Sequence, residues 1–217
     1  MAISGDAQKP RLRGVLHQVA FVLASVATAA LIWMARPGLQ RRSTVVFGAS
    51  LVALFAVSAL YHRVSWRPRA LSFMRRLDHS AVVVAIAGGY TPLLALVPSA
   101  RGGHAALAVM WIAAGIGVAR AFAWPRAPTW VAASLCVAIG WVGSGEVIDR
   151  VPAAGASTIA AFVASGLLYT LGAVVYATRR PDPVPHVFGY HEVFHALVVL
   201  GTALLFGHVA LVLRAGQ

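Results

Sequence analysis

Residues 193–213 read VFHALVVLGTALLFGHVALVL, a run of 21 residues without a charged side chain. A helix of this length is about 30 Å long, which matches the hydrocarbon core of a lipid bilayer. Six further uncharged runs occupy residues 14–35, 43–62, 79–100, 102–119, 127–145 and 151–178. The sequence therefore predicts an all-α integral membrane protein, a bundle of seven transmembrane helices.

The composition supports a membrane protein with a single domain. Hydrophobic residues make up 59% of the chain, charged residues make up 11%, and the mean hydropathy is +0.78. We expect a short cytoplasmic tail at residues 1–13 and a transmembrane domain at residues 14–217, with Pro152 outside the bilayer. The first uncharged run lacks a small-residue cleavage site before Arg36, so we interpret it as a helix and not as a secretory signal. Any chemistry must then take place within the bundle.

The basic residues predict the orientation of the chain. The net charge is +12, but the basic side chains lie at the ends of the uncharged runs, so we do not expect a nucleic-acid partner. With a cytoplasmic N-terminus, twelve basic residues lie on the inner side: Lys9, Arg11, Arg13, Arg63, Arg67, Arg69, Arg75, Arg76, Arg120, Arg126, Arg179 and Arg180. Six then lie on the outer side: Arg36, Arg41, Arg42, Arg101, Arg150 and Arg214. Cytoplasmic loops carry an excess of Lys and Arg. We therefore expect a multi-pass protein of the cell membrane with its N-terminus cytoplasmic and its C-terminus external.

Histidines gather at one end of the predicted bundle. Six of the eight lie near the cytoplasmic ends of the expected helices: His17, His62, His79, His186, His191 and His195. His191 and His195 are four residues apart and share one face of the last helix, while His62 ends the second helix at the same level. Three neutral imidazoles and a water form the arrangement that catalytic zinc favours, so we predict a zinc site on these three residues. The alternative is that they are merely interfacial. His104 and His208 lie toward the opposite end and are excluded as ligands.

Two more polar residues are expected at the level of this site. Asp78 should open the third helix, where it could accept a proton from a metal-bound water or orient a ligand imidazole. Ser58 precedes His62 by one helical turn and points the same way. We predict that Asp78 and Ser58 are catalytic. The alternatives are a surface ion pair or an N-cap for Asp78 and helix packing for Ser58. His17 and His79 are interpreted as interfacial or supporting residues.

Residues 191–195 read HEVFH, which has the form of the HExxH signature of zinc peptidases. In such a peptidase Glu192 would be the general base, and a membrane-embedded peptidase draws its third ligand from a later helix. No later helix is expected here, so a third ligand must come from earlier in the chain. Glu192 projects about 100° away from His191, and a place in the headgroup region beside Arg179 or Arg180 is equally compatible with the sequence.

Helix boundaries are inferred from charged and proline-rich segments. The longest charged connection is expected at residues 63–78, where basic and aromatic side chains would contact anionic headgroups. Three prolines between residues 181 and 185 should end the sixth helix, so the last helix is expected to begin near His186. Gly88, Gly89 and Pro92 predict a bend or a cavity wall in the third helix, which could make room for a lipid chain.

Three segments resemble the signature blocks of a known family. They are Ser58-Ala-Leu-Tyr-His62, Arg76-Leu-Asp78-His79-Ser80 leading into Ala87-Gly-Gly-Tyr-Thr-Pro92, and Phe188-Gly-Tyr-His191-Glu-Val-Phe-His195. In this order they look like the blocks of the hemolysin III family, the bacterial members of the progestin and adiponectin receptor (PAQR) superfamily. The sequence departs from the family pattern at Val83-Val84, where an isoleucine-tyrosine pair is expected. It departs again at Leu16-His17-Gln18, where many members carry a threonine-histidine-glycine run.

The resemblance implies a seven-helix fold with a zinc ion near the cytoplasmic side. His62, His191 and His195 match the zinc ligands of the family, Asp78 matches the aspartate that holds the zinc-bound water, and Ser58 matches the serine of the second-helix motif. The superfamily also looks related to alkaline ceramidases. The implied chemistry is hydrolysis of an amide bond in a sphingolipid-like or other lipid.

These observations lead to three hypotheses about function. The leading one is a zinc-dependent membrane hydrolase that acts on an amide or ester bond of a lipid, with membrane lipids as partners and an acyl-lipid substrate in the bundle. The second is a non-enzymatic protein with a structural zinc, which permeabilises membranes as a hemolysin does or senses them. The third is an intramembrane metalloprotease that uses Glu192 as its base.

Overall fold

The computed structural model describes residues 10–99 and 103–215, and this part of the chain is almost entirely helical. Its elements are α1 (Val15–Met34), α2 (Leu39–Arg63), α3 (Pro68–Leu96), α4 (His104–Ala123), α5 (Thr129–Val142), α6 (Ser144–Ile148), α7 (Val151–Ala154), α8 (Ala156–Thr178) and α9 (Tyr190–Ala215). Seven of the described segments are long and apolar enough to cross a membrane, when α5 and α6 are taken together as Thr129–Val147. The predicted fold class, a seven-helix membrane bundle, is confirmed.

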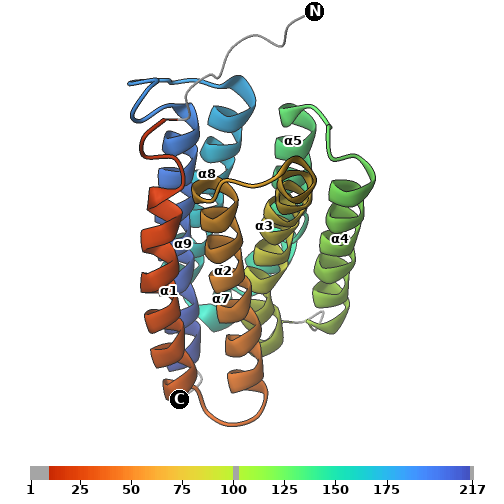
Figure 1. The fold of residues 1–217 in the computed structure, drawn as a ribbon. Coiled ribbons are helices and arrows are strands. Elements are labelled where there is room, and N and C mark those ends of the chain that lie inside the picture. Colours follow the sequence, from red (N-terminus) through yellow and green to blue (C-terminus); the bar gives the residue numbers. More distant parts are fainter. Residues whose placement is uncertain (1–9, 100–102, 216–217) are drawn as a thin grey trace, which may run out of the picture.

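The helices run side by side as an upright bundle (Figure 1). In it α1 packs on α2 and α9, α8 packs on α9, and α3 lies in the middle, in contact with α2, α4, α5 and α9. We call the end where α1, α3 and α9 begin the site end, and it is the upper end in Figure 1. The beginning of α1 and the end of α9 lie at opposite ends of the bundle, as an odd number of spans requires.

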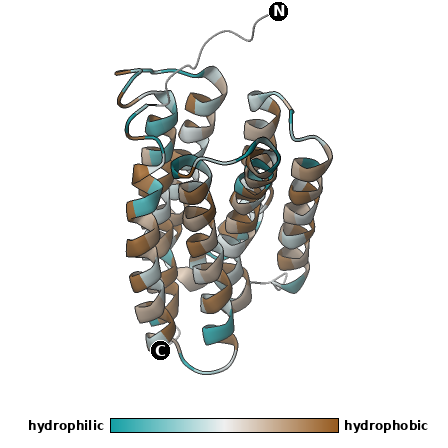
Figure 2. Ribbon diagram, viewed as in Figure 1, coloured by the Kyte–Doolittle hydropathy of each residue, from teal (hydrophilic) through white to brown (hydrophobic). Residues whose placement is uncertain are grey.

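Hydrophobic residues recur along all the long helices (Figure 2), and they include both buried and exposed side chains. Phe47, Leu51 and Val209 are buried between helices, whereas Leu23 and Val26 of α1 are about two-thirds exposed. A soluble protein rarely exposes so much contiguous apolar surface. In a bilayer these exposed side chains face lipid, so the pattern is that of a membrane-spanning bundle.

The glycines of α3 serve close packing between helices. A Cβ atom added at Gly88 would lie 2.0 Å from Ser50 Oγ of α2, and one added at Gly89 would lie 2.8 Å from Leu205 Cδ2 of α9. Pro92 lies inside α3, and the helix continues past it to Leu96. The central helix therefore approaches its neighbours at positions that tolerate no side chain.

Two predicted boundaries are wrong. The third helix was expected to open at Asp78, but α3 begins at Pro68, and the connection after α2 is only residues 64–67. Proline suits the first turn of a helix, and long arginine side chains can reach the interface while their backbone stays helical. Charge thus marks the edge of the apolar span and not the end of the helix.

The last helix begins at Tyr190 and not near His186. Val184 and Phe188 form an isolated β-bridge, and the backbone N–H of Tyr190 donates to Asp182 Oδ1 at 2.8 Å. The bridge keeps residues 184–188 in a turn, and the Asp182 carboxylate accepts the first N–H of the helix at Tyr190. The helix therefore cannot begin earlier.

Pro152 lies in the short helix α7, which Gly155 with φ +82° separates from α8. The predicted division into a tail at 1–13 and a transmembrane domain stays a prediction, because residues 1–9 lie outside the described part of the chain.

Candidate metal centre

Three histidines from two helices meet at the site end. His62 lies in the last turn of α2, and His191 and His195 lie in the first two turns of α9. One ring nitrogen from each lies within 4.8 Å of the others, and His62 Nε2 is 3.2 Å from His191 Nε2. His195 is buried, while His62 and His191 are half-buried. The sequence prediction that these three side chains converge is confirmed.

This cluster fits a metal ion by its donors and by its spacing. Two nitrogens that bind one zinc ion at about 2.0–2.1 Å in a tetrahedral arrangement lie about 3.3 Å apart. The observed 3.2 Å between His62 Nε2 and His191 Nε2 is close to this value. His195 Nδ1 is buried and has no hydrogen-bond partner among the described residues, as in a site that is incomplete without a ligand. The three histidines could hold a metal ion, and zinc as that metal stays a prediction.

Asp78 and Ser58 lie beside the histidines and not among them. Asp78 is half-buried in the third turn of α3, and it is hydrogen-bonded to the buried hydroxyl of Ser58 on α2. Its carboxylate does not belong to the set of mutually close ligand atoms. Asp78 is within electrostatic range of Tyr176, whose ring centroid is 5.8 Å from that of His191. Because α3 begins ten residues earlier, the N-cap alternative for Asp78 is wrong.

Glu192 is part of a buried contact between the two ends of the chain. Its carboxylate accepts a hydrogen bond from Arg13 Nε, and its other oxygen accepts the backbone N–H of Gly189 at 2.9 Å. Glu192 is fully buried and pairs with Arg13, so the alternative of a place in the headgroup region beside Arg179 or Arg180 is wrong. The backbone N–H groups of Arg11 and Leu12 also donate to residues 186 and 187, each at 3.1 Å. We call this set of contacts the α1–α9 clamp.

Two further side chains contact the cluster: His17, which the sequence predicts to be interfacial or supporting, and Tyr176, which sequence reasoning missed. His17 on α1 is 2% exposed and its ring is stacked on that of His195, with centroids 3.8 Å apart and an interplanar angle of 7°. Tyr176 on α8 contacts His191 and Phe194. The sequence does mark His17 as a candidate, because it is a polar residue near the start of an apolar run. The run does not reveal how α1 is rotated about its axis, and this rotation turns His17 toward the cluster. Nothing local in the sequence marks Tyr176.

The other described histidines are not members of the three-histidine cluster, although His79 is within electrostatic range of His191. His79 is half-buried on α3, within electrostatic range of Arg75 and Arg120. His104 is exposed at the start of α4. His208 is buried, and its Nδ1 is 3.0 Å from the carbonyl oxygen of Thr158, at a depth about 20 Å beyond His195 along α9.

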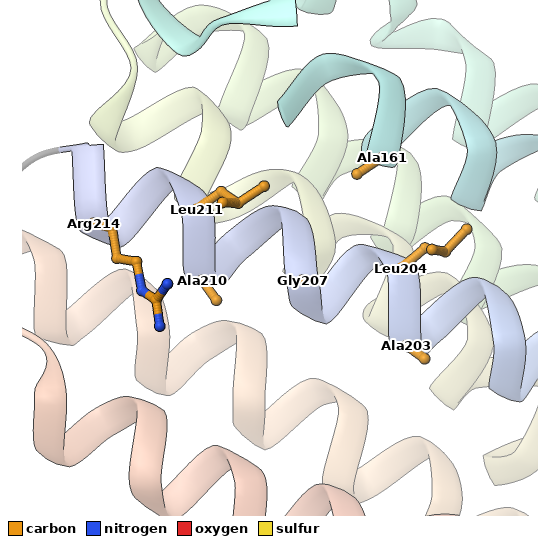
Figure 3. A pocket seen from close by; sticks show the side chains of 7 residues that line it. All are labelled: Ala161, Ala203, Leu204, Gly207, Ala210, Leu211 and Arg214. Atoms are coloured by element: carbon orange, nitrogen blue, oxygen red, sulfur yellow. The ribbon is translucent and has the colours of Figure 1, made fainter. Parts of the chain in front are cut away.

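Two apolar hollows lie at the opposite end of the bundle. One, of about 330 Å³, is lined by Ala161, Ala203, Leu204, Gly207, Ala210, Leu211 and Arg214 (Figure 3). The other, of about 290 Å³, lies on another side of α9 and shares Arg214. The lining residue of α9 nearest to His195 is Ala203, about 12 Å away along the helix, and none of the three cluster histidines lines either hollow.

The fold and the cluster define a class: a multi-pass helical membrane protein with a possible three-histidine metal site at one end of its bundle. The family described as Haemolysin-III related matches residues 6–206. Hemolysin-3 of Bacillus cereus is 29% identical over 165 residues, which cover 74% of this chain and 70% of that protein. Hemolysin-3 homolog of Bacillus subtilis (strain 168) is 24% identical over 164 residues, which cover 76% of this chain and 74% of that protein. The chain belongs to the hemolysin III family of the PAQR superfamily, and it is a multi-pass protein of the cell membrane.

Proposed function

We propose that this protein is a zinc-dependent membrane hydrolase that cleaves an amide or ester bond of a lipid. The observation that carries the proposal is the convergence of three imidazoles beside a hydrogen-bonded Asp78–Ser58 pair at one end of the bundle. Ionisable groups are costly within a membrane, so a cluster of them is typical of a functional site. Because His62 and His191 are half-buried at the end of the bundle, a lipid whose cleavable bond lies near its headgroup could reach them.

Each residue of the site has a role in this chemistry. His62, His191 and His195 would hold the metal, which when bound lowers the pKa of a water and polarises a carbonyl oxygen. Asp78 accepts the proton of the attacking water and passes it to the leaving group. The Ser58 hydroxyl donates to Asp78 and so fixes the direction of the carboxylate. The apolar environment suits the acyl chain of the substrate.

Membrane permeabilisation is the second candidate, and the names of the two Bacillus relatives, Hemolysin-3 and Hemolysin-3 homolog, favour it. In this case the metal would be structural, and Asp78 would not be needed for activity. The two candidates therefore differ in what the loss of this single carboxylate does.

Intramembrane proteolysis through Glu192 has less support. A general base needs a free carboxylate oxygen near the attacking water. Both oxygens of Glu192 are engaged, one by Arg13 and the other by the N–H of Gly189. Glu192→Gln should therefore leave hydrolysis in place, whereas loss of peptide cleavage in this variant would support the protease.

The decisive variant is Asp78→Asn. The amide keeps the size of the side chain and an oxygen acceptor for Ser58, but it cannot take a proton. We expect zinc content and fold to be preserved while hydrolysis of N-acyl and ester lipids falls at least about 100-fold, as loss of a general base does. Zinc is measured by elemental analysis and hydrolysis by mass spectrometry of lipid products in liposomes.

Asp182→Asn is the matched control, because Asp182 is an exposed aspartate at the same end of the bundle, and Asn keeps the oxygen that accepts the N–H of Tyr190. This variant should hydrolyse lipids as the wild type does. A wild type that hydrolyses nothing on a broad panel, while liposome leakage is strong and unchanged in Asp78→Asn, would replace the hydrolase with the permeabilising protein.

A further inference from the structure

His17 is a fourth imidazole at the metal centre. It lies in the first turn of α1, and its side chain is enclosed by the ring of Phe55 at 5.2 Å and the ring of His195 at 3.8 Å between centroids. It is also within electrostatic range of His191. The fourth histidine is therefore not interfacial but packed inside the cluster.

Neither ring nitrogen of His17 has a hydrogen-bond partner among the described residues. Both nitrogens are buried, and an imidazole always carries at least one N–H donor. A buried donor without a partner destabilises a fold, and a phenylalanine would fill the same space without this penalty. Packing alone therefore does not explain why position 17 is a histidine, because neither ring nitrogen makes a hydrogen bond within the described part of the chain.

The stacking excludes His17 as a ligand of the ion that His195 would bind. A metal lies close to the plane of a ligand imidazole, at about 2.0–2.1 Å from its nitrogen. The two rings are parallel within 7°, and stacked rings stay about 3.5 Å or more apart. An ion in the plane of His195 is thus too far from the plane of His17 for coordination, but a nitrogen of His17 remains within reach of an oxygen bound next to that ion.

We propose that the imidazole N–H of His17 donates a hydrogen bond to an oxygen atom of the substrate, the carbonyl or carboxylate oxygen bound beside the metal. The proposal rests on the proposed function, because it assigns His17 to the substrate side of the same site. It gives the buried donor a partner whenever a ligand is present. It also explains why the ring is held flat against His195, since stacking fixes the direction of the N–H.

The test uses the full-length protein in detergent, stripped of metal and reloaded with Co²⁺, whose visible spectrum reports its coordination. Acetohydroxamate is the probe, because it supplies a carbonyl and a hydroxamate oxygen. His17→Phe keeps an aromatic ring for stacking and removes the donor. We expect unchanged cobalt content and an unchanged spectrum without the probe, together with an affinity for acetohydroxamate that is lower by about 10-fold or more, the effect of one hydrogen bond to a charged group.

His208→Phe is the matched control, because His208 is also fully buried and its Nε2 also has no hydrogen-bond partner in the described part of the chain. It should bind acetohydroxamate as the wild type does. His17→Gln restores a donor without the stack and should recover part of the affinity.

Equal affinity in His17→Phe and the wild type would overturn the proposal, and so would loss of cobalt from His17→Phe, which would make His17 a ligand or a support of His195. A wild type that binds neither cobalt nor the probe would overturn the proposal together with the metal site. A wild type that binds both but hydrolyses no lipid would remove only the proposed function, while the role of His17 would still be decided by the affinities.

Discussion

His62 and His191 contact each other ring to ring although 129 residues separate them in the sequence. The 3.2 Å between the two Nε2 atoms fits a hydrogen bond between neutral imidazoles, and it also fits two nitrogens that share one metal ion, which is the arrangement proposed for this site. We expect about one zinc per chain in the purified protein, and a lower content in His62→Ala, His191→Ala and His195→Ala, since two remaining ligands bind far more weakly. Elemental analysis of the purified variants measures this.

The matched variant for metal content is His208→Ala, which removes a histidine as buried as His195 and about 20 Å from the cluster. It should retain the zinc of the wild type. If all four alanine variants hold the same amount of zinc, the three histidines are not its ligands.

Sequence reasoning reached the three histidines because two simple rules apply to them. Residues four apart share a helical face, and residues at the ends of apolar runs share a membrane level. Neither rule says how a helix is rotated about its axis. The stacking of His17 on His195 and the burial of Glu192 against Arg13 depend on that rotation, and α1 carries too uniform an apolar sequence to reveal it.

The α1–α9 clamp joins the residues just before α1 to the start of α9 and to the segment that precedes it. Arg13 is 19% exposed at its side chain and Glu192 is 1% exposed, so this ion pair is largely shielded from water. Removing one partner of a buried pair leaves an uncompensated charge and costs about 3–5 kcal/mol. We expect Glu192→Ala to lower the melting temperature of the detergent-solubilised protein markedly.

Arg11→Gln is the comparison for the clamp, because the side chain of Arg11 is exposed and only its backbone contacts the segment before α9. Its melting temperature should equal that of the wild type. If Glu192→Ala melts at the same temperature as well, the ion pair contributes nothing to holding the two helices together.

Close packing of α3 gives a second prediction for the helices. Gly88→Ala would place a Cβ 2.0 Å from Ser50 Oγ and 2.7 Å from Ser50 Cβ, so rotation of the serine cannot relieve the overlap. Overpacking of this kind costs about 1–3 kcal/mol. The corresponding change in α4, Gly115→Ala, meets nothing within 4 Å and should leave stability unchanged or raise it by up to about 1 kcal/mol. Thermal unfolding of the two variants side by side measures the difference, and equal stability would contradict the close approach.

The number and order of the spanning helices could be predicted from the uncharged runs, but several of their ends could not. Apolar composition reports where a helix enters the hydrocarbon core, whereas its ends are set by local hydrogen bonding. Pro68 starts α3 well before the apolar run, and Asp182 receives the first N–H of α9 at Tyr190. The break at Gly155 between α7 and α8 depends on a positive φ, which cannot be predicted from composition.

The basic residues predict the orientation of the whole molecule in the membrane. Twelve basic residues lie on the side of the site end and six on the other side, which favours a cytoplasmic location for the site end. We expect a cysteine in place of Arg69, which is exposed at the start of α3, to be shielded from an impermeant thiol reagent in intact cells. A cysteine in place of Ala153, exposed in α7 at the opposite end, should react.

Both cysteine variants are made in a Cys136→Ser background, because Cys136 is the single native cysteine. Permeabilised cells provide the comparison in which both positions react. Labelling of the Arg69 position alone in intact cells would invert the topology and move the histidine cluster to the external side.

The separation of His62 from His191 also has a consequence for biosynthesis. At about 5–20 residues per second, roughly 6–26 s pass on the ribosome between the synthesis of His62 and that of His191, which are 129 residues apart. During this interval a nascent chain holds one of the three histidines of the cluster, however many helices have already entered the bilayer. Loading of the proposed metal site is therefore expected to follow synthesis of the final helix, and a chain whose translation stops before α9 would reach the membrane without the complete set of three histidines.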